Sequence, residues 1–273
     1  MSMSDTVIRP IVRIKPSQEP NAVDDCIIVE APLEIQIGYT ALGKRHRVPL
    51  ATTLRTPGDD FNLVAGWLLA EGIIFSPSDL HQIRYRGNSD IVLAELSPTV
   101  SFNPEEKQRR FPISSACGWC GRRDNTDAPA QVIPHSLNVS SDCIVTLPKV
   151  LRNGQGLFSA TGGAHAVALT DAFGTLRIRC EDVGRHNALD KLLGAMFRDK
   201  KLPLHDSIAV FSGRLGHELV QKAVSGGIQI LCSIGAPSSA ALEMADAYGI
   251  TVCGFVRQDG FNLYCGPERI IQA

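Results

Sequence analysis

The sequence contains no run of apolar residues long enough to span a bilayer, and its first 20 residues lack the apolar core of a secretory signal. It also lacks an excess of charge of one sign, since 27 Lys and Arg face 28 Asp and Glu, for a formal net charge of −1. Domains that bind nucleic acid are usually clearly basic, so this balance argues against nucleic-acid binding. The composition therefore predicts a cytoplasmic protein that binds neither membranes nor nucleic acid.

The chain has eight cysteines but lacks the features that accompany structural disulfides. Its 273 residues can bury an ordinary core, and no export signal is present. Cys180, Cys232 and Cys253 lie in or beside β-branched apolar runs, where cysteine packs as a small hydrophobe. We therefore expect reduced cysteines, most of them in the core.

Cys117 and Cys120 differ from the others because they form a C-x-x-C pair between glycines. This spacing is typical of a reactive or metal-binding pair, and the thiolate is the nucleophilic form of cysteine. Arg122 and Arg123 follow directly and favour the thiolate electrostatically. The pair lies within residues 101–140, a proline-rich stretch without clear periodicity, and long loops of this kind are usually functional or disordered. We predict a mobile loop whose catalytic residues are Cys117 and Cys120.

The part before this loop divides into two segments. Residues 1–30 are polar and contain several prolines, which predicts a loose lead-in. Residues 31–100 predict a small α+β domain, with strands over 33–37 and 47–53. A helix then follows, with Thr56 as N-cap, Pro57 as first helical residue and Gly72 as its stop.

Residues 141–273 alternate strand and helix patterns and predict an α/β domain. Strands over 165–170 and 175–180 flank a turn at 171–174, and a helix follows over 187–197. Strands over 207–211, 228–232 and 250–256 then alternate with helices over 215–225 and 238–248. This pattern predicts a mixed, largely parallel sheet covered on both faces, in an order like that of the cytidine-deaminase fold.

Polar clusters fall where the predicted strands begin or end, at residues 161–165, 181–187, 212–214 and 254–260. In such sheets ligands bind beyond the carboxyl ends of the strands, where helix N-termini favour anions. Arginines there can hold a phosphate, and Asp182 or Asp259 can accept hydrogen bonds from a purine or a sugar hydroxyl. Each cluster also has a plain structural interpretation, because Asp182 can cap a helix and Gly213 can form a turn. Together they predict a pocket for a nucleotide-like anion.

Several motifs are spread over nearly the whole chain. They are Thr56-Pro57-Gly58-Asp59-Asp60 with Glu71-Gly72-Ile73-Ile74, Cys117-Gly118-Trp119-Cys120-Gly121, Thr161-Gly162-Gly163-Ala164-His165, residues 181–191 (EDVGRHNALDK), and Ser212-Gly213-Arg214 with Glu218 and Lys222. The most specific is the long acidic, glycine- and histidine-containing run at 181–191, whereas C-x-x-C alone is weak. Together these motifs resemble the FdhD family.

This resemblance implies a cytoplasmic homodimer that takes persulfide sulfur from a cysteine desulfurase. The sulfur would pass to molybdenum bis(molybdopterin guanine dinucleotide), a bound substrate, and so activate formate dehydrogenase as the client enzyme. The resemblance makes Cys117 the persulfide carrier and Cys120 its helper or alternate carrier. We expect GDP or GMP to mimic the substrate, and no metal of the protein's own. The expected site residues are Val256, Arg257, Gln258, Asp259, Gly260 and Phe261, together with Gly163, His165, Asp182, Arg185, His186, Ser212, Gly213 and Arg214.

Three other uses of C-x-x-C compete with this interpretation. A zinc site could add His135 and Cys143, although structural zinc sites usually show a second closely spaced pair. A zinc deaminase needs an H-x-E motif ahead of its cysteines, and none precedes Cys117 here. Thiol-disulfide oxidoreductases place C-x-x-C at a helix N-terminus directly after a strand, whereas these cysteines follow a proline-rich stretch. The alternative function is therefore a thiol-disulfide redox or zinc-binding module.

Overall fold

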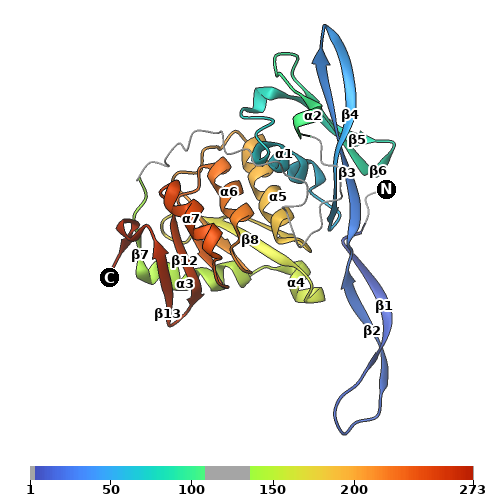
Figure 1. Ribbon diagram of the computed structural model, residues 1–273. Helices are drawn as coiled ribbons and strands as arrows, with labels where there is room; N and C mark the ends of the chain where they lie inside the picture. The colour runs from blue at the N-terminus through green and yellow to red at the C-terminus, as the bar shows by residue number, and fades with distance from the viewer. Residues whose placement is uncertain (1–3, 108–135, 273) are drawn as a thin grey trace.

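The computed structural model describes residues 4–107 and 136–272. Its N-terminal strands β1 (Thr6–Arg13) and β2 (Asn21–Ile28) pair as an antiparallel hairpin that extends away from the rest of the molecule (Figure 1). The prediction of a loose lead-in is thus wrong for these strands. Pro10, which argued against a strand, lies in a two-stranded ribbon, where each strand is an edge and proline is tolerated.

A four-stranded sheet in the order β4-β3-β6-β5 follows the hairpin. Its strands are β3 (Ala31–Ala41), β4 (Lys44–Arg55), β5 (Leu80–Arg86) and β6 (Asn88–Leu96). The predicted pairing of the first two is confirmed, since β3 and β4 are antiparallel neighbours. A 3-10 turn (Pro77–Asp79) precedes β5, and a short helix α2 (Pro104–Lys107) follows β6.

The helix α1 (Asp60–Ala70) packs on one face of this sheet and begins later than predicted. Asp59 is its N-cap residue, and Gly72 just beyond its end has a positive φ of 62°, where glycine is favoured. Thr56 does not cap the helix, because its backbone and hydroxyl groups bond instead to Asp182, Val183 and Lys191.

The second sheet has six strands in the order β13-β12-β11-β10-β8-β9. These strands are β8 (His165–Thr170), β9 (Leu176–Asp182), β10 (Ile208–Phe211), β11 (Ile230–Ser233), β12 (Thr251–Arg257) and β13 (Gly260–Cys265). Only β10–β11 and β11–β12 are parallel, whereas β8–β9, β8–β10 and β12–β13 are antiparallel. The mixed α/β class is confirmed, but the expectation of a largely parallel sheet is wrong. The strands β8 and β9 pair antiparallel with each other, β8 pairs antiparallel with β10, and the unpredicted β13 adds a third antiparallel pair.

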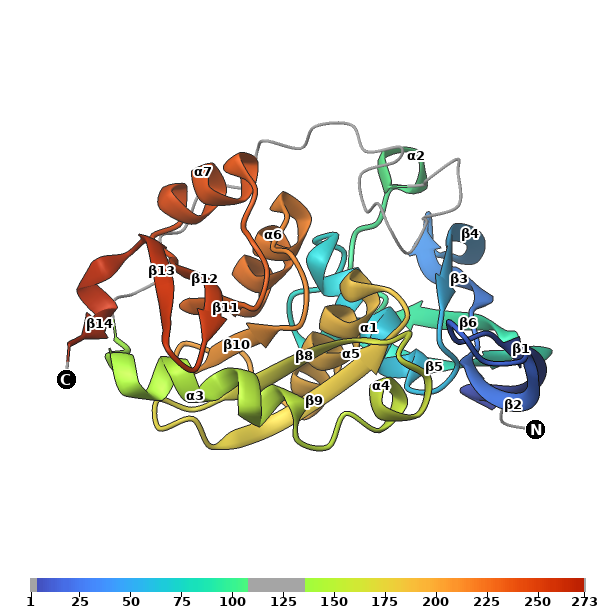
Figure 2. The ribbon, with the colours of Figure 1, turned by 90° about the horizontal axis from the view of Figure 1, so that it is seen from below.

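Helices cover both faces of this sheet (Figure 2). α5 (Arg185–Arg198), α6 (His217–Gly226) and α7 (Ser239–Ala247) lie on one face, and α3 (Ser141–Arg152) lies on the other. The remaining elements are α4 (Gly156–Thr161), a 3-10 turn (Pro267–Arg269) and the short parallel pair β7 (Val139–Ser140) and β14 (Ile270–Ile271).

One continuous hydrophobic core joins the two sheets through α1 and α5. The helices approach closely at Gly66 and Gly194, where a Cβ on Gly194 would lie 1.8 Å from the Asn62 carbonyl oxygen. Only glycine fits at such a crossing. A shared core therefore crosses the predicted division between residues 31–100 and 141–273.

Candidate functional site

The four predicted polar clusters meet at one edge of the six-stranded sheet. β10, β11 and β12 run parallel and end there at Phe211, Ser233 and Arg257. The antiparallel β8 starts at the same edge with His165, and β9 ends there with its register partner Asp182. Segments far apart in sequence are thereby brought side by side, as the sequence predicted.

His165 and Ser212 lie together at the centre of this edge. The Ser212 hydroxyl accepts from the Ala166 amide at 2.9 Å and lies 3.4 Å from His165 Nδ1. Burial lowers the pKa of His165, and the charge of Arg185 lowers it further, while Asp182 acts in the opposite direction. His165 is therefore a neutral imidazole at pH 7, able to donate from one nitrogen and accept at the other.

Gly213 and Gly235 allow the ends of β10 and β11 to approach each other. A Cβ on Gly235 would lie 3.0 Å from the Arg214 amide nitrogen, and one on Gly213 would lie 3.3 Å from the His165 ring. Ser233 ties the two loops by donating to the Gly213 carbonyl at 2.6 Å and accepting from the Gly235 amide at 3.2 Å. The exposed Arg214 side chain is thus carried on a tightly held backbone.

The segment 256–261 forms the turn between β12 and β13. Arg257 donates to the carbonyls of Ile234 and Val256, at 2.7 and 2.8 Å, so its guanidinium is held beside the end of β11. Gln258 and Asp259 are exposed at the tip. Val256 is instead fully buried against the α3 side of the sheet, and Phe261 packs partly against the same core. Of this segment, Arg257, Gln258 and Asp259 are the members available to a ligand.

Asp182 holds the two sheets together. Its carboxylate is fully buried and accepts from the amides of Thr56 and Gly184, at 3.1 and 2.8 Å, while Lys191 Nζ lies 2.7 Å away. The side chain of Asn187 bridges Asp182 and the Leu54 carbonyl, at 3.0 and 2.7 Å. The expectation that this carboxylate accepts from a ligand differs from the structure, which surrounds it with protein donors.

The remaining predicted residues take different positions around the edge. Arg185 is the first residue of α5 and is close enough to influence His165 electrostatically. His186 is buried, with Nε2 3.9 Å from the Glu218 carboxylate at the start of α6. Gly163 packs against the N-terminal hairpin, since a Cβ there would lie 2.8 Å from the Ile28 side chain. Glu181 accepts from the amides of Leu157 and Phe158, so it caps α4.

Cys117, Cys120, Arg122 and Arg123 lie outside the described residues. The other six cysteines are free thiols, and Cys180, Cys232 and Cys253 are buried as predicted. Burial raises the pKa of Cys180 to about 12, and the pKa of Cys232 is raised by its hydrogen bond with Cys253 and by burial. The thiols of Cys180 and Cys232 therefore stay protonated and are poor nucleophiles.

Residues 4–107 and 136–272 contain no group of three His, Cys, Asp or Glu side chains that could hold a metal ion. His135, one proposed zinc ligand, is outside this range, and burial followed by the Asp171 charge raises the pKa of Cys143. Within the same residues, no helix combines the length and the apolar character that crossing a bilayer requires.

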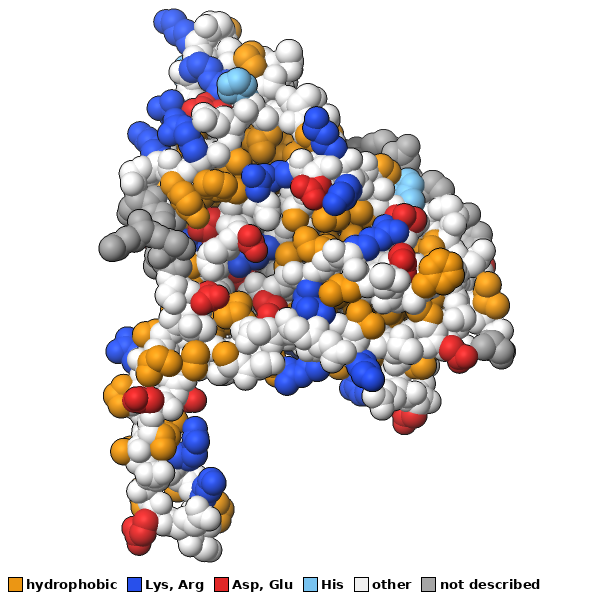
Figure 3. Space-filling model, turned by 180° about the vertical axis from the view of Figure 1, so that it is seen from behind, with side chains coloured by type: hydrophobic (Ala, Val, Ile, Leu, Met, Phe, Trp, Pro, Cys, Tyr) orange, Lys and Arg blue, Asp and Glu red, His pale blue; other side chains and the backbone are white. Residues whose placement is uncertain are grey.

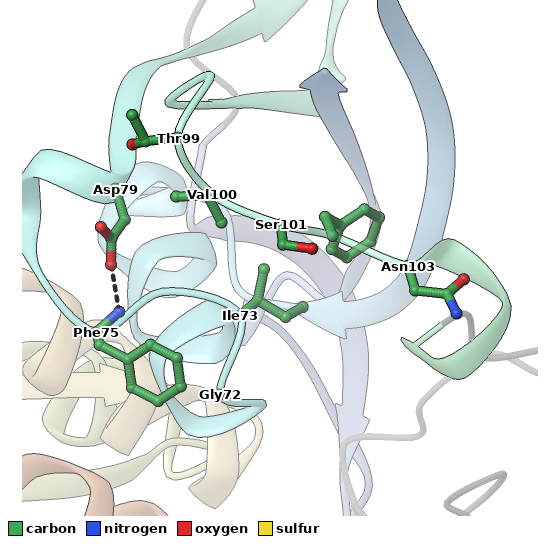
Figure 4. A pocket seen from close by; sticks show the side chains of 9 residues that line it. Gly72, Ile73, Phe75, Asp79, Thr99, Val100, Ser101 and Asn103 are labelled. Atoms are coloured by element: carbon green, nitrogen blue, oxygen red, sulfur yellow. Dashed lines mark hydrogen bonds between the residues drawn. The ribbon is translucent and has the colours of Figure 1, made fainter. Parts of the chain in front are cut away.

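A separate open pocket of about 490 Å³ lies in the N-terminal half, between the end of α1 and the segment after β6 (Figure 4). Its lining residues are Gly72, Ile73, Phe75, Asp79, Thr99, Val100, Ser101, Phe102 and Asn103. The Phe75 amide donates to Asp79 at 2.8 Å, which fixes one wall. Sequence reasoning missed this pocket because residues 97–103 carry no motif or periodicity.

Comparisons with known proteins place the whole chain in one family. Residues 28–271 match the model of the FdhD/NarQ family. The chain is 38% identical to the sulfur carrier protein FdhD of Nocardia farcinica, over 99% of this chain and 96% of the relative. It is 37% identical to the same-named protein of Sulfurisphaera tokodaii, over 97% and 99%.

The fold is also similar to a crystal structure of a proposed formate dehydrogenase accessory protein from Desulfotalea psychrophila. That match has a TM-score of 0.74 at 22% identity and covers 98% of this chain and 100% of the other. Since the family model spans both sheets and the segment between them, the chain belongs to the FdhD/NarQ family.

Proposed function

We propose that this chain is a sulfur carrier for the maturation of formate dehydrogenase, working in the cytoplasm as a homodimer. The observation that carries the proposal is the full-length similarity to proteins named as sulfur carriers, across a chain that holds a C-x-x-C pair. The six described cysteines form no disulfides with one another, which supports placing the protein in a reducing compartment.

Sulfur loading on Cys117 is a thiol exchange. The Cys117 thiolate attacks the terminal sulfur of a persulfide on a cysteine desulfurase, and the donor's cysteine leaves as a thiolate. One S–S bond forms and one breaks, so no external oxidant is needed. The terminal sulfur then lies on Cys117 as a persulfide.

Release of the sulfur uses Cys120. Its thiolate attacks the inner sulfur of the Cys117 persulfide and forms a Cys117–Cys120 disulfide, while the outer sulfur leaves as sulfide. The sulfur gains two electrons and the two cysteines lose them, so a thiol reductant must restore the pair. The acceptor in this proposal is molybdenum bis(molybdopterin guanine dinucleotide), bound as substrate.

The acceptor's guanine-dinucleotide part would bind at the edge formed by His165, Ser212, Arg214 and Arg257. Arg214 is exposed and Arg257 is held beside the end of β11, so both can meet a pyrophosphate. Neutral His165 and Ser212 offer polar groups to the rest of the nucleotide. Asp182 takes no part, since protein donors occupy its carboxylate.

Mass spectrometry of the intact protein tests the carrier step. After incubation with a cysteine desulfurase and L-cysteine, we expect one added sulfur that is lost on reduction and absent from Cys117→Ala. Cys143→Ala, which changes a partly buried cysteine elsewhere, is the matched control and should still gain sulfur. Tightly held zinc, or a Cys117–Cys120 disulfide without added sulfur, would instead support the metal-binding or redox alternative.

A further inference from the structure

The outer face of the four-stranded sheet, opposite α1, carries a row of arginines. They are Arg45 and Arg47 on β4 and Arg84 and Arg86 on β5, and we call them the arginine face. Alternate residues of a strand point to the same side, so these pairs share one face. In Figure 3 Lys and Arg side chains gather around a few acidic ones at the upper end of the molecule, over this sheet.

Three of these arginines converge on one carboxylate, that of Glu95 on β6. Arg45 donates to it, Arg47 donates at 3.2 Å, and Arg84 Nη2 lies 3.8 Å away. The Glu95 side chain is only 10% exposed, whereas those of Arg45, Arg47 and Arg84 are 41%, 50% and 40% exposed. The carboxylate is therefore beneath the arginines, and the guanidiniums face solvent.

A glycine on the neighbouring strand β3 leaves room for the Glu95 carboxylate. Gly38 lies opposite Glu95, and a Cβ there would be 2.0 Å from its Oε2. Burial raises the pKa of Glu95, but the hydrogen bonds and charges of Arg45 and Arg47 outweigh it and lower the pKa below its ordinary value. Glu95 stays ionised and fixes the arginines, and its single charge is shared among three of them.

Side-chain hydrogen bonds also hold the rest of the face in place. Arg86 donates to Gln36 at 2.7 Å, and Gln36 donates to Glu34 at 2.6 Å. Leu93, on the same side of β6 as Glu95, is fully buried although it belongs to neither of the two core clusters, so long side chains of this face cover it. Four held arginines against two glutamates form a preorganised surface for negative charge.

We propose that the arginine face docks an acidic segment of a partner protein. A small anion is usually enclosed by a pocket, whereas this surface is an open sheet face. Its strands lie about 4.8 Å apart, and alternate residues along a strand lie about 6.7 Å apart. Alternate carboxylates of an extended acidic segment have the same repeat and can each meet a guanidinium.

The position of the face indicates which partner this is, and this step rests on the proposed function. Arg45 donates to the Leu96 carbonyl at 3.0 Å, at the start of the segment that leads to α2, and α2 contacts β4. α2 ends at Lys107, ten residues before Cys117, and ten extended residues span at most about 36 Å. A partner seated on the arginine face is thus within reach of Cys117, as the sulfur donor must be.

Loading kinetics from two sulfur sources test this docking. We would compare the intact chain with Arg47→Glu/Arg84→Glu and with Lys200→Glu/Lys201→Glu, a control with the same charge change at exposed positions after α5. Loading by a cysteine desulfurase with L-cysteine should slow about tenfold or more in the arginine variant at low salt, and less at high salt. Loading by glutathione persulfide, which needs no docking, should not change.

Several outcomes would overturn the proposal. Unchanged loading by the desulfurase would remove the docking role, and slower loading from both sources would show that the substitutions disturb the cysteines. Arg47→Gln/Arg84→Gln, which adds no repulsive charge, should show a smaller effect in the same direction. Circular dichroism would confirm that each variant is folded.

A peptide measurement separates this proposal from the proposed function. If the intact chain takes sulfur from neither source, the carrier function fails, and the face is judged by binding of a labelled Glu-Val-Glu-Val-Glu-Val-Glu peptide. Binding that is lost in Arg47→Glu/Arg84→Glu, and absent for the matching Gln peptide, supports the acidic-segment site. If the acidic peptide does not bind, the proposal is overturned. It is also overturned if GDP displaces the peptide and Arg47→Glu/Arg84→Glu no longer binds GDP.

Discussion

Two polar clusters lie close together in this molecule and differ in how fully protein groups occupy them. The junction cluster, made of Thr56, Asp182, Asn187 and Lys191, is buried, and its groups bond to one another and to Leu54. The edge cluster of His165, Ser212, Arg214 and Arg257 is partly exposed. Its members are held from the backbone and keep polar groups toward solvent. Saturation with protein partners distinguishes the structural junction cluster from the edge cluster that we propose binds a ligand, although similar residue types form both.

The largest effect we expect comes from breaking the junction cluster. Asp182→Ala should lower the free energy of unfolding by about 3–5 kcal/mol, because Lys191 would remain as an unpaired buried charge. Urea unfolding measures this loss, and Asp182→Asn should lose less because it keeps some hydrogen bonds. If Asp182→Ala kept the free energy of unfolding of the unchanged protein but no longer bound GDP, the carboxylate would belong to the edge cluster instead.

Substitution at the crossing of α1 and α5 should reduce stability almost as much. Gly194→Ala should lower the free energy of unfolding by about 1–3 kcal/mol, since its Cβ would clash with the Asn62 carbonyl on α1. Thermal unfolding followed by circular dichroism measures the change. An increase in stability, as helical Gly→Ala changes usually give, would mean that the two helices can separate without cost.

How much of the fold and of the candidate site could be predicted depends on how far apart in the sequence the interacting residues lie. Residues 207–211 read as a strand because a central strand buried on both faces is continuously apolar, and the turn at 171–174 carries its own signal in Asp171 and Gly174. The role of Asp182 was not predictable in this way, since its partner Thr56 is 126 residues away. The strand β13 was missed because its side chains are mostly exposed and show no alternation.

Substitutions in the edge cluster should weaken binding and leave stability nearly unchanged. Arg257→Ala and Arg214→Ala should each weaken GDP binding about tenfold, because each removes a charge-assisted contact to phosphate. Isothermal titration calorimetry measures this, with Arg13→Ala on the hairpin as a control that should bind normally. Absence of GDP binding to the intact chain would remove the proposed nucleotide site, and equal weakening by Arg13→Ala would make the effect one of overall charge.

The smallest effect concerns pH and tests whether His165 is neutral in the folded protein. Its pKa is lowered on folding, so the unfolded chain binds this proton more readily. The contribution of His165 to stability is therefore fully present above its ordinary pKa of about 6.5 and is lost as the pH falls toward its lower folded value. Replacing His165 with Gln should flatten the decline in stability as the pH falls below about 6.5. Urea midpoints at several pH values measure the slope, and a steeper decline in His165→Gln would mean that the edge cluster stabilises the charged imidazole.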